Sequence, residues 1–193
     1  MKKWMSWILI LAMMVTGACA ETNEPLFETL AGIEWSFCSG VGAWSTDLRI
    51  WPDGTFKGEF HDSEMGETGD QYPYGTVYGC SFIGQLTLVE QVDERTWKLR
   101  VDELIPEKDQ KDEFIEDGTR YVTTAEPYGI SKGDEMLLYS PGMRLDQLPE
   151  EMILWTHTLE LETRPETLDC WFLCSQKNES GFVGYVLETP AEP

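Results

Sequence analysis

The feature that most constrains the fold is a series of short segments in which apolar and polar residues alternate. In the longest of them, residues 78–88, one face carries Tyr78, Cys80, Phe82, Gly84, Leu86 and Leu88. Alternation with a period of two places such side chains on one side of a β-strand. Because glycine in mid-strand is typical of bends and barrel corners, Gly84 predicts a bend or a bulge.

A second alternating region predicts a β-hairpin. Residues 43–51 and 55–60 are rich in aromatic and β-branched residues, and they flank Pro52-Asp53-Gly54, a turn sequence. In the second of these segments Phe56 and Phe60 alternate with charged residues. One face of the hairpin is therefore predicted to be buried and the other to face water.

The remaining chain divides into further short segments. Strands are predicted at residues 33–38, 96–101, 119–124, 135–140, 156–162, 168–174 and 181–187, and short helices at 24–30 and 148–155. Residues 61–75 are expected to form a 15-residue loop, and 106–118 a solvated loop or an exposed short helix. About ten strands with almost no helix predict an all-β fold: an antiparallel, lipocalin-like barrel with one or two short helices.

Gly32-Ile33-Glu34-Trp35, after a short helical segment, resembles the opening of lipocalin-type barrels, with one residue more between Gly and Trp than is usual there. Longer patterns are similar to those of uncharacterised exported bacterial lipoproteins over nearly the whole mature chain. These patterns are Trp35-x-Phe37-x-Ser39-Gly40, Gly42-Ala43-Trp44-x-Thr46, Asp53-Gly54-x-Phe56-x-Gly58 and Gly133-Asp134-Glu135 to Ser140-Pro141-Gly142. The resemblance implies a location in the bacterial cell envelope and a lipocalin-like barrel, but no activity.

The N-terminus has the layout of a secretory signal, with two lysines, an apolar stretch shorter than the roughly 20 residues of a membrane span, and small residues at its end. Residues 15–19 match a lipobox, in which Cys19 is lipidated. Cleavage after Ala20 is the alternative. The lipobox predicts a signal peptide at 1–18, a tether at 19–25 and one barrel domain at 26–193, anchored to the membrane by its lipid.

The composition is strongly acidic, with 14 basic and 35 acidic residues and a net charge of −21. Removing residues 1–18 takes away two lysines and leaves a mature charge of −23. Such a surface repels phosphate backbones and anionic headgroups, so nucleic acid is excluded as a partner.

Five cysteines are present, and lipidation of Cys19 leaves an even set: Cys38, Cys80, Cys170 and Cys174. In one strand Cys170 and Cys174 would lie about 13 Å apart, too far to bond each other. Export therefore predicts at least one disulfide that joins the strands of Cys38 and Cys80 to each other or to the strand of Cys170 and Cys174. The alternatives are four free thiols, or one bridge and two thiols.

No catalytic residue or cofactor is assigned. Residues 129–133 match G-x-S-x-G, with Asp146 and His157 in the order of α/β-hydrolases, but the sequence around Ser131 is typical of a turn between strands. The acidic loop at 61–70 has oxygen ligands for calcium without EF-hand spacing, and we assign no metal site.

The expected function is therefore that of an extracytoplasmic binding module. Most tryptophans are expected to fill the core, but Trp51 has outward parity at a strand end. A small neutral or cationic ligand is predicted to enter the barrel at an end carrying Trp51, Tyr72 and Tyr74. The alternatives are a filled-core envelope or interaction protein without a ligand, and a hydrolase.

Overall fold

The computed structural model describes residues 24–107, 110–158 and 163–187. The predicted signal peptide and Cys19 lie outside this part of the chain, as does the predicted tether up to residue 23. The elements are α1 (Glu24–Leu30), β1 (Ile33–Cys38), β2 (Trp44–Ile50), β3 (Thr55–Glu64), β4 (Thr76–Asp93), β5 (Thr96–Pro106), β6 (Glu113–Glu116), β7 (Thr119–Thr123), β8 (Glu135–Tyr139), α2 (Glu150–Ile153), β9 (Trp171–Ser175) and β10 (Ser180–Val186), with 3-10 turns at Leu145–Gln147 and Leu154–Thr156.

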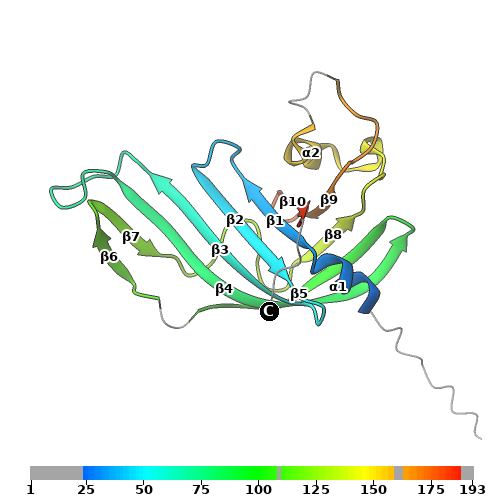
Figure 1. The fold of residues 1–193 in the computed structure, drawn as a ribbon, viewed down its shortest axis with the longest axis horizontal. Helices are drawn as coiled ribbons and strands as arrows, with labels where there is room; N and C mark the ends of the chain where they lie inside the picture. Colours follow the sequence, from blue (N-terminus) through cyan, green and yellow to red (C-terminus); the bar gives the residue numbers. More distant parts are fainter. Residues whose placement is uncertain (1–23, 108–109, 159–162, 188–193) are drawn as a thin grey trace, which may run out of the picture.

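Eight strands form a closed antiparallel barrel in the order β1-β2-β3-β4-β5-β8-β9-β10. The β3–β4 pairing and the β1–β10 pairing complete the ring. Each barrel strand therefore pairs with its nearest barrel neighbours along the chain (Figure 1). The predicted all-β antiparallel barrel is confirmed, and so are the short helices.

The bulge predicted in the long alternating segment is present. The β4–β5 register shifts between Gln85 and Leu86, directly after Gly84. Gly84 lies opposite Phe56 of β3, and a β-carbon built on it would lie 2.2 Å from the Phe56 ring and 2.3 Å from the Glu103 carbonyl oxygen. Only glycine leaves room for these groups, so this position is set by packing as well as by bending.

The prediction of a loop or an exposed short helix at residues 106–118 is wrong where this segment forms strand. These residues contribute the end of β5 and the strand β6, which forms a hairpin with β7, and β7 pairs in parallel with the start of β4. The hairpin extends the sheet beyond the barrel, on the left of Figure 1. Its turn is Asp117-Gly118, both with positive φ (46° and 77°), which is the backbone that two-residue hairpins favour.

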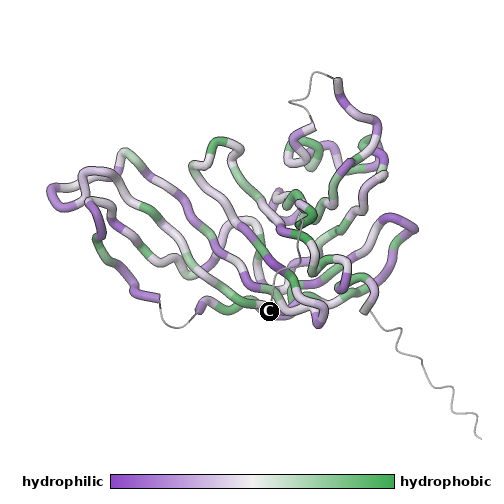
Figure 2. The backbone as a smooth tube through the Cα atoms, viewed as in Figure 1, coloured by the Kyte–Doolittle hydropathy of each residue, from purple (hydrophilic) through white to green (hydrophobic). Residues whose placement is uncertain are grey.

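Two further boundaries differ from the predictions. Strand β3 runs on to Glu64, because Ser63 and Glu64 still pair with Val77 and Thr76, so the loop before β4 shortens to residues 65–75. Figure 2 shows this hydrophilic loop in purple at the far left. The predicted strand at 156–162 is wrong where it is described: Thr156 ends a 3-10 turn and His157 has φ of 56°. Residues 159–162 lie outside the described part.

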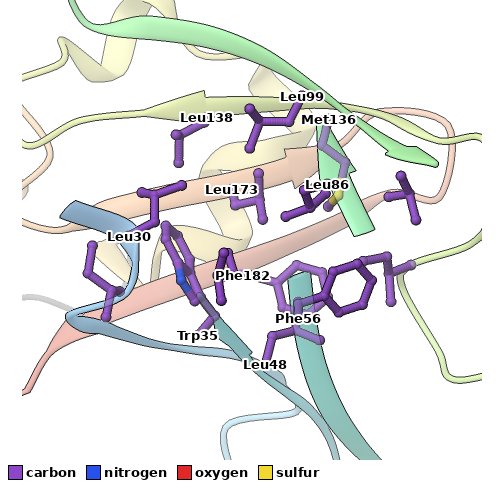
Figure 3. Packing of buried hydrophobic residues seen from close by; sticks show 14 of the residues in the cluster. Leu30, Trp35, Leu48, Phe56, Leu86, Leu99, Met136, Leu138, Leu173 and Phe182 are labelled. Atoms are coloured by element: carbon purple, nitrogen blue, oxygen red, sulfur yellow. The ribbon is translucent and has the colours of Figure 1, made fainter. Parts of the chain in front are cut away.

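The barrel interior is filled by side chains. Large aromatic and aliphatic residues from every side converge there (Figure 3), and Trp35, Phe37, Phe56, Phe82 and Phe182 are each at most 1% exposed. Leu30, Leu48, Leu99, Met136 and Leu138 complete the packing. The expectation that most tryptophans fill the core holds: Trp35 is buried in it, and four others are partly buried and pack against it, namely Trp44, Trp97, Trp155 and Trp171.

Both ends of the barrel are covered. At one end α1 inserts Phe27 and Leu30 into the core. At the other end the segment 124–134 crosses between strands, with the backbone of Thr124 bonded to Gly79 and that of Gly133 to Val101.

Side chains of the barrel bind this crossing segment from two sides. Thr46 donates a hydrogen bond to the Tyr128 carbonyl (2.7 Å), and Ser180 donates one to the Gly129 carbonyl (2.5 Å). Ile130 is fully buried beneath.

A second apolar cluster covers the outer face of β8, β9 and β10. Residues 140–158 and 163–168, which include α2, pack on this face, as seen at the right of Figure 1. Tyr139, Met152, Leu168, Phe172 and Cys174 are all buried there. Among the described helices none has the length and apolar character to cross a bilayer.

Candidate functional site on the outer barrel wall

The outer face of β2, β3 and β4 carries three rows of side chains that follow from the strand register. In the first row Arg49 lies opposite Lys57, and in the second Asp47 lies opposite Glu59. In the third row Ser45 lies opposite His61. This is the face that the hairpin pattern predicted to be wet.

Two adjoining depressions follow these rows and share Glu59; together they are named the outer groove. One has a volume of about 360 Å³ and is lined by Glu34, Asp47, Arg49, Trp51, Lys57 and Glu59. The other has a volume of about 340 Å³, and its side chains include Glu59, His61, Ser81, Lys111, Phe114 and Tyr121.

The groove is hollow where β4 has small residues. Gly79 lies opposite His61 and Ser81 lies opposite Glu59, so no bulky side chain rises from β4 at these two rows. A β-carbon on Gly79 would lie 2.5 Å from the Phe60 carbonyl oxygen. The close approach of the backbones therefore restricts this position to glycine.

The β6–β7 hairpin and the segment before it form the far wall. The Phe114 and Tyr121 rings stack at 4.8 Å with an interplanar angle of 11°, and Lys111 Nζ lies 5.3 Å from the Phe114 centroid. The side chain of Gln110 accepts a hydrogen bond from the Ser81 amide and donates one to the Ser81 carbonyl, as a pairing strand would. This wall is thus fixed to β4 rather than loosely appended.

Ser45, Asp47 and His61 form a hydrogen-bonded cluster in the wall of the groove. The Ser45 hydroxyl donates to Asp47 Oδ2 (2.7 Å) and lies 3.2 Å from His61 Nδ1. Because the hydroxyl has one proton and gives it to Asp47, the contact with Ser45 requires a proton on His61 Nδ1, and in a neutral imidazole Nε2 is then an acceptor. Ser45 is thus not activated as a nucleophile, so the cluster orients His61 and does not form a catalytic triad.

The first two rows of the groove carry opposite charges. Arg49 and Lys57 in the first row are both basic, and Asp47 and Glu59 in the second row are both acidic. Arg49 also pairs with Glu34 (3.2 Å), and Lys57 pairs with Glu107 (3.2 Å). Since like charges directly opposite each other are unfavourable, the neighbouring row of opposite sign is what makes the Asp47–Glu59 pair tolerable.

The structure does not bring the three predicted ligand residues together, and the prediction of one shared barrel mouth is wrong. Trp51 precedes β3 and lines the outer groove, whereas Tyr72 and Tyr74 lie in the loop after β3. Ten residues of strand separate these ends, about 30 Å at 3.3 Å per residue. The turn before a strand and the loop after it lie at opposite ends of that strand, so Trp51 and the two tyrosines cannot share one mouth.

Tyr72 belongs to a polar network that attaches the loop to β7. The Arg120 guanidinium lies 4.8 Å from the Tyr72 centroid and donates to Glu67 Oε1 (2.5 Å), while Tyr78 donates to Glu67 Oε2 (2.6 Å). The hydrogen bond from Tyr78, followed by the Arg120 charge, holds the pKa of Glu67 below its ordinary value. Tyr74 is 65% exposed.

The acidic loop considered for calcium is divided by the fold. Asp62 and Glu64 lie in β3, and Glu67 is committed to Arg120. Within the described ranges, no group of three or more potential metal ligands gathers in one place.

The four cysteines of the described residues, Cys38, Cys80, Cys170 and Cys174, are free thiols in the structure. Cys80 belongs to the interior core, whereas Cys174 lies in the outer cluster over β8–β10, so the barrel wall separates these two. Burial raises the pKa of Cys174 to about 12 and that of Cys170 to about 11. The predicted disulfide is not present in this structure, and it stays a prediction for oxidised protein.

The G-x-S-x-G match is a turn, as its surroundings indicate. Ser131 is followed by the strand β8 rather than by a helix, and Asp146 is exposed and paired with Arg144. The turn is held by Asp134, which is fully buried and accepts hydrogen bonds from the Ser131 amide (2.7 Å) and Lys177 (2.8 Å).

Sequence reasoning missed most residues of the outer groove. Asp47 and Glu59 were assigned to a wet face, and His61 to a loop. The signal that could have revealed the far wall is Asp117-Gly118, a hairpin sequence within a charged segment.

In comparisons with known proteins, no family model, no curated protein and no solved structure matches this chain.

Proposed function

We propose that this protein is an exported, lipid-anchored binding module of the bacterial cell envelope that holds a small neutral or cationic ligand on its outer wall. The observation that carries the proposal is the contrast between the two sides of the barrel wall. Inside, the packing is tight and both ends are covered. Outside, Trp51, Glu59 and His61 line a groove of two depressions.

The identity of the barrel as lipocalin-like is part of this proposal. Its support is the next-neighbour order of the eight strands and the short helix before β1. A ligand inside such a barrel would need a cavity of about 300 Å³ or more. Trp35, Phe82 and Phe182 occupy the interior instead, which favours a site outside.

Ligand binding can be tested with a Cys19→Ala form of the protein and a panel of small neutral and cationic compounds. Tryptophan fluorescence and calorimetry should detect binding that Trp51→Ala weakens, because Trp51 lines the groove. Leu138→Met, a volume-conserving change in the interior, is the matched control and should bind as the wild type does. A ligand whose affinity depends on Leu138 and not on Trp51 would contradict the proposed location.

The second candidate function is an interaction protein without a small ligand. The observation in its favour is an exposed apolar pair on the outer wall: Ile83 and Ile105 face each other across β4 and β5 and are 46% and 44% exposed. If this pair forms an interface between copies, sedimentation velocity should show self-association that Ile83→Lys abolishes. A monomer at all concentrations would remove this form of the candidate.

A further inference from the structure

We propose that the ligand of the outer groove is a neutral oligosaccharide. This inference rests on the proposed function, since it names the ligand class of the same site. Three features carry it: the charge balance of the groove, the aromatic side chains at its two ends, and its length.

The lining is balanced in charge, although the chain is not. Three acidic side chains line the groove, Glu34, Asp47 and Glu59, and so do three basic ones, Arg49, Lys57 and Lys111. In the whole chain 35 acidic residues stand against 14 basic ones. The scarce cations are therefore concentrated here, and the local field favours neither anions nor cations.

A polyhydroxylated ligand can use both kinds of group. Arg49, Lys57 and Lys111 are hydrogen-bond donors only. Asp47 and Glu59 are acceptors, and with its proton on Nδ1 a neutral His61 offers Nε2 as a further acceptor. Sugar hydroxyls donate and accept, so they can pair with every member of this set without bringing a charge of their own.

Aromatic side chains stand at both ends of the groove. Trp51 lines one depression, and the stacked Phe114 and Tyr121 line the other. The C–H faces of pyranose rings pack on aromatic faces, and a partly exposed ring on a fixed strand provides such a face at low entropic cost. Phe114 is 36% exposed, and its hairpin is fixed to β4.

The distance between these ends requires a chain of sugars. The row of Arg49 and Lys57 lies beside Trp51, and the row of Ser63, Val77 and Tyr121 lies at the other end. From Lys57 to Ser63 is six residues of β3, about 20 Å at 3.3 Å per residue. One monosaccharide cannot contact both ends, so the geometry selects an oligosaccharide of several residues.

The test begins with the Cys19→Ala protein on a printed array that holds neutral and charged glycans, followed by calorimetry with a neutral hexasaccharide from the array, its monosaccharide, and spermidine. We expect the hexasaccharide to bind and the monosaccharide to bind at least about tenfold more weakly, since it reaches one aromatic end only. Trp51→Ala and Tyr121→Ala should each weaken hexasaccharide binding by about tenfold.

Two control variants accompany these changes. Tyr185→Ala removes a 55% exposed aromatic from β10, outside the groove, and should leave binding unchanged. Tyr121→Phe keeps the stacked ring beside Phe114 and should bind nearly as the wild type does, because the ring and not the hydroxyl group is needed.

The outcomes separate the proposed function from the inference that the ligand is an oligosaccharide. Hexasaccharide binding that depends on Trp51 and Tyr121 supports the inference. Spermidine binding that depends on Trp51, with no neutral glycan bound, would overturn the oligosaccharide while leaving the proposed function intact. Glycan binding that neither aromatic variant changes, or an array without any neutral glycan bound, would overturn the inference.

Discussion

The filled interior depends on a reciprocal arrangement of two glycines and two phenylalanines, and this arrangement can be tested by pairs of substitutions. Gly58 of β3 lies opposite Phe82 of β4, and Phe56 of β3 lies opposite Gly84 of β4. A β-carbon on Gly58 would lie 2.3 Å from the Phe82 ring and 2.7 Å from Leu48 Cδ2, so it would meet side chains only. On Gly84 it would also meet the Glu103 carbonyl oxygen at 2.3 Å, which is backbone.

The two sites should therefore respond differently to a smaller neighbour. Gly58→Ala overpacks the core and should cost about 1–3 kcal/mol. Phe82→Leu should cost less than the 3–5 kcal/mol typical of truncation to alanine. Because the leucine frees the space that the new methyl group needs, the double variant should be more stable than the sum of the single effects by about 1 kcal/mol or more.

Gly84→Ala with Phe56→Leu is the matched control. Its coupling should be much smaller, because shortening Phe56 does not move the Glu103 carbonyl. Urea unfolding measures all six variants, and with a slope of about 2 kcal/mol per M the Gly58→Ala midpoint should fall by roughly 0.5–1.5 M. A harmless Gly58→Ala, or equal coupling at both sites, would refute the account of a tightly filled barrel.

Three further predictions concern the turn, the thiols and the N-terminus. Asp134→Ala should destabilise the fold by about 3 kcal/mol, because it removes a buried carboxylate and leaves its hydrogen-bond donors without this partner. Asp146→Ala, at an exposed carboxylate, should leave the urea midpoint nearly unchanged. Equal effects of the two variants would contradict this prediction. Burial raises the pKa of Cys170 and Cys174 above their ordinary value of 9. Above pH 9 the native state therefore keeps thiol protons that the unfolded chain loses. The free energy of unfolding of the reduced protein should then fall between about pH 9 and 12. Cys170→Ser and Cys174→Ser together should flatten that fall, and an unchanged slope would count against the assignment. Metabolic labelling with a radioactive fatty acid in a bacterial host should mark the wild type and not Cys19→Ala, and an unlabelled wild type would remove the anchor.

Period-two alternation was enough to predict the strands that have one face in the core. The hairpin around Asp53-Gly54, the long run that ends at Leu88 and the bend at Gly84 follow from it directly, because burial on one side leaves a strong pattern. Where both faces are wet the pattern disappears. All four residues of β6 are exposed, and its two apolar residues, Phe114 and Ile115, are adjacent, so no period-two pattern marks the strand and it was missed.

The site was harder to predict because it depends on register. Asp47, Glu59 and Ser81 become neighbours only when three strands pair in one alignment, which no local pattern determines. Trp51 was recognised from its parity, but it lies in the turn before β3, whereas Tyr72 and Tyr74 lie in the loop after β3. These positions are at opposite ends of one strand, so the predicted ligand site joined residues that the topology keeps apart.

The helix that covers one end of the barrel also has a consequence for how the protein would stand on a membrane. Glu24, where α1 begins, is five residues from Cys19, and five residues of chain span at most about 18 Å. A lipid on Cys19 would hold the end covered by α1 close to the bilayer, while the end covered by the crossing segment 124–134 would point away from it. With strands tilted about 35–45° from the barrel axis, the outer groove would then rise obliquely from Trp51, near the lipid, to Tyr121, which would be first to meet a polymer arriving from outside.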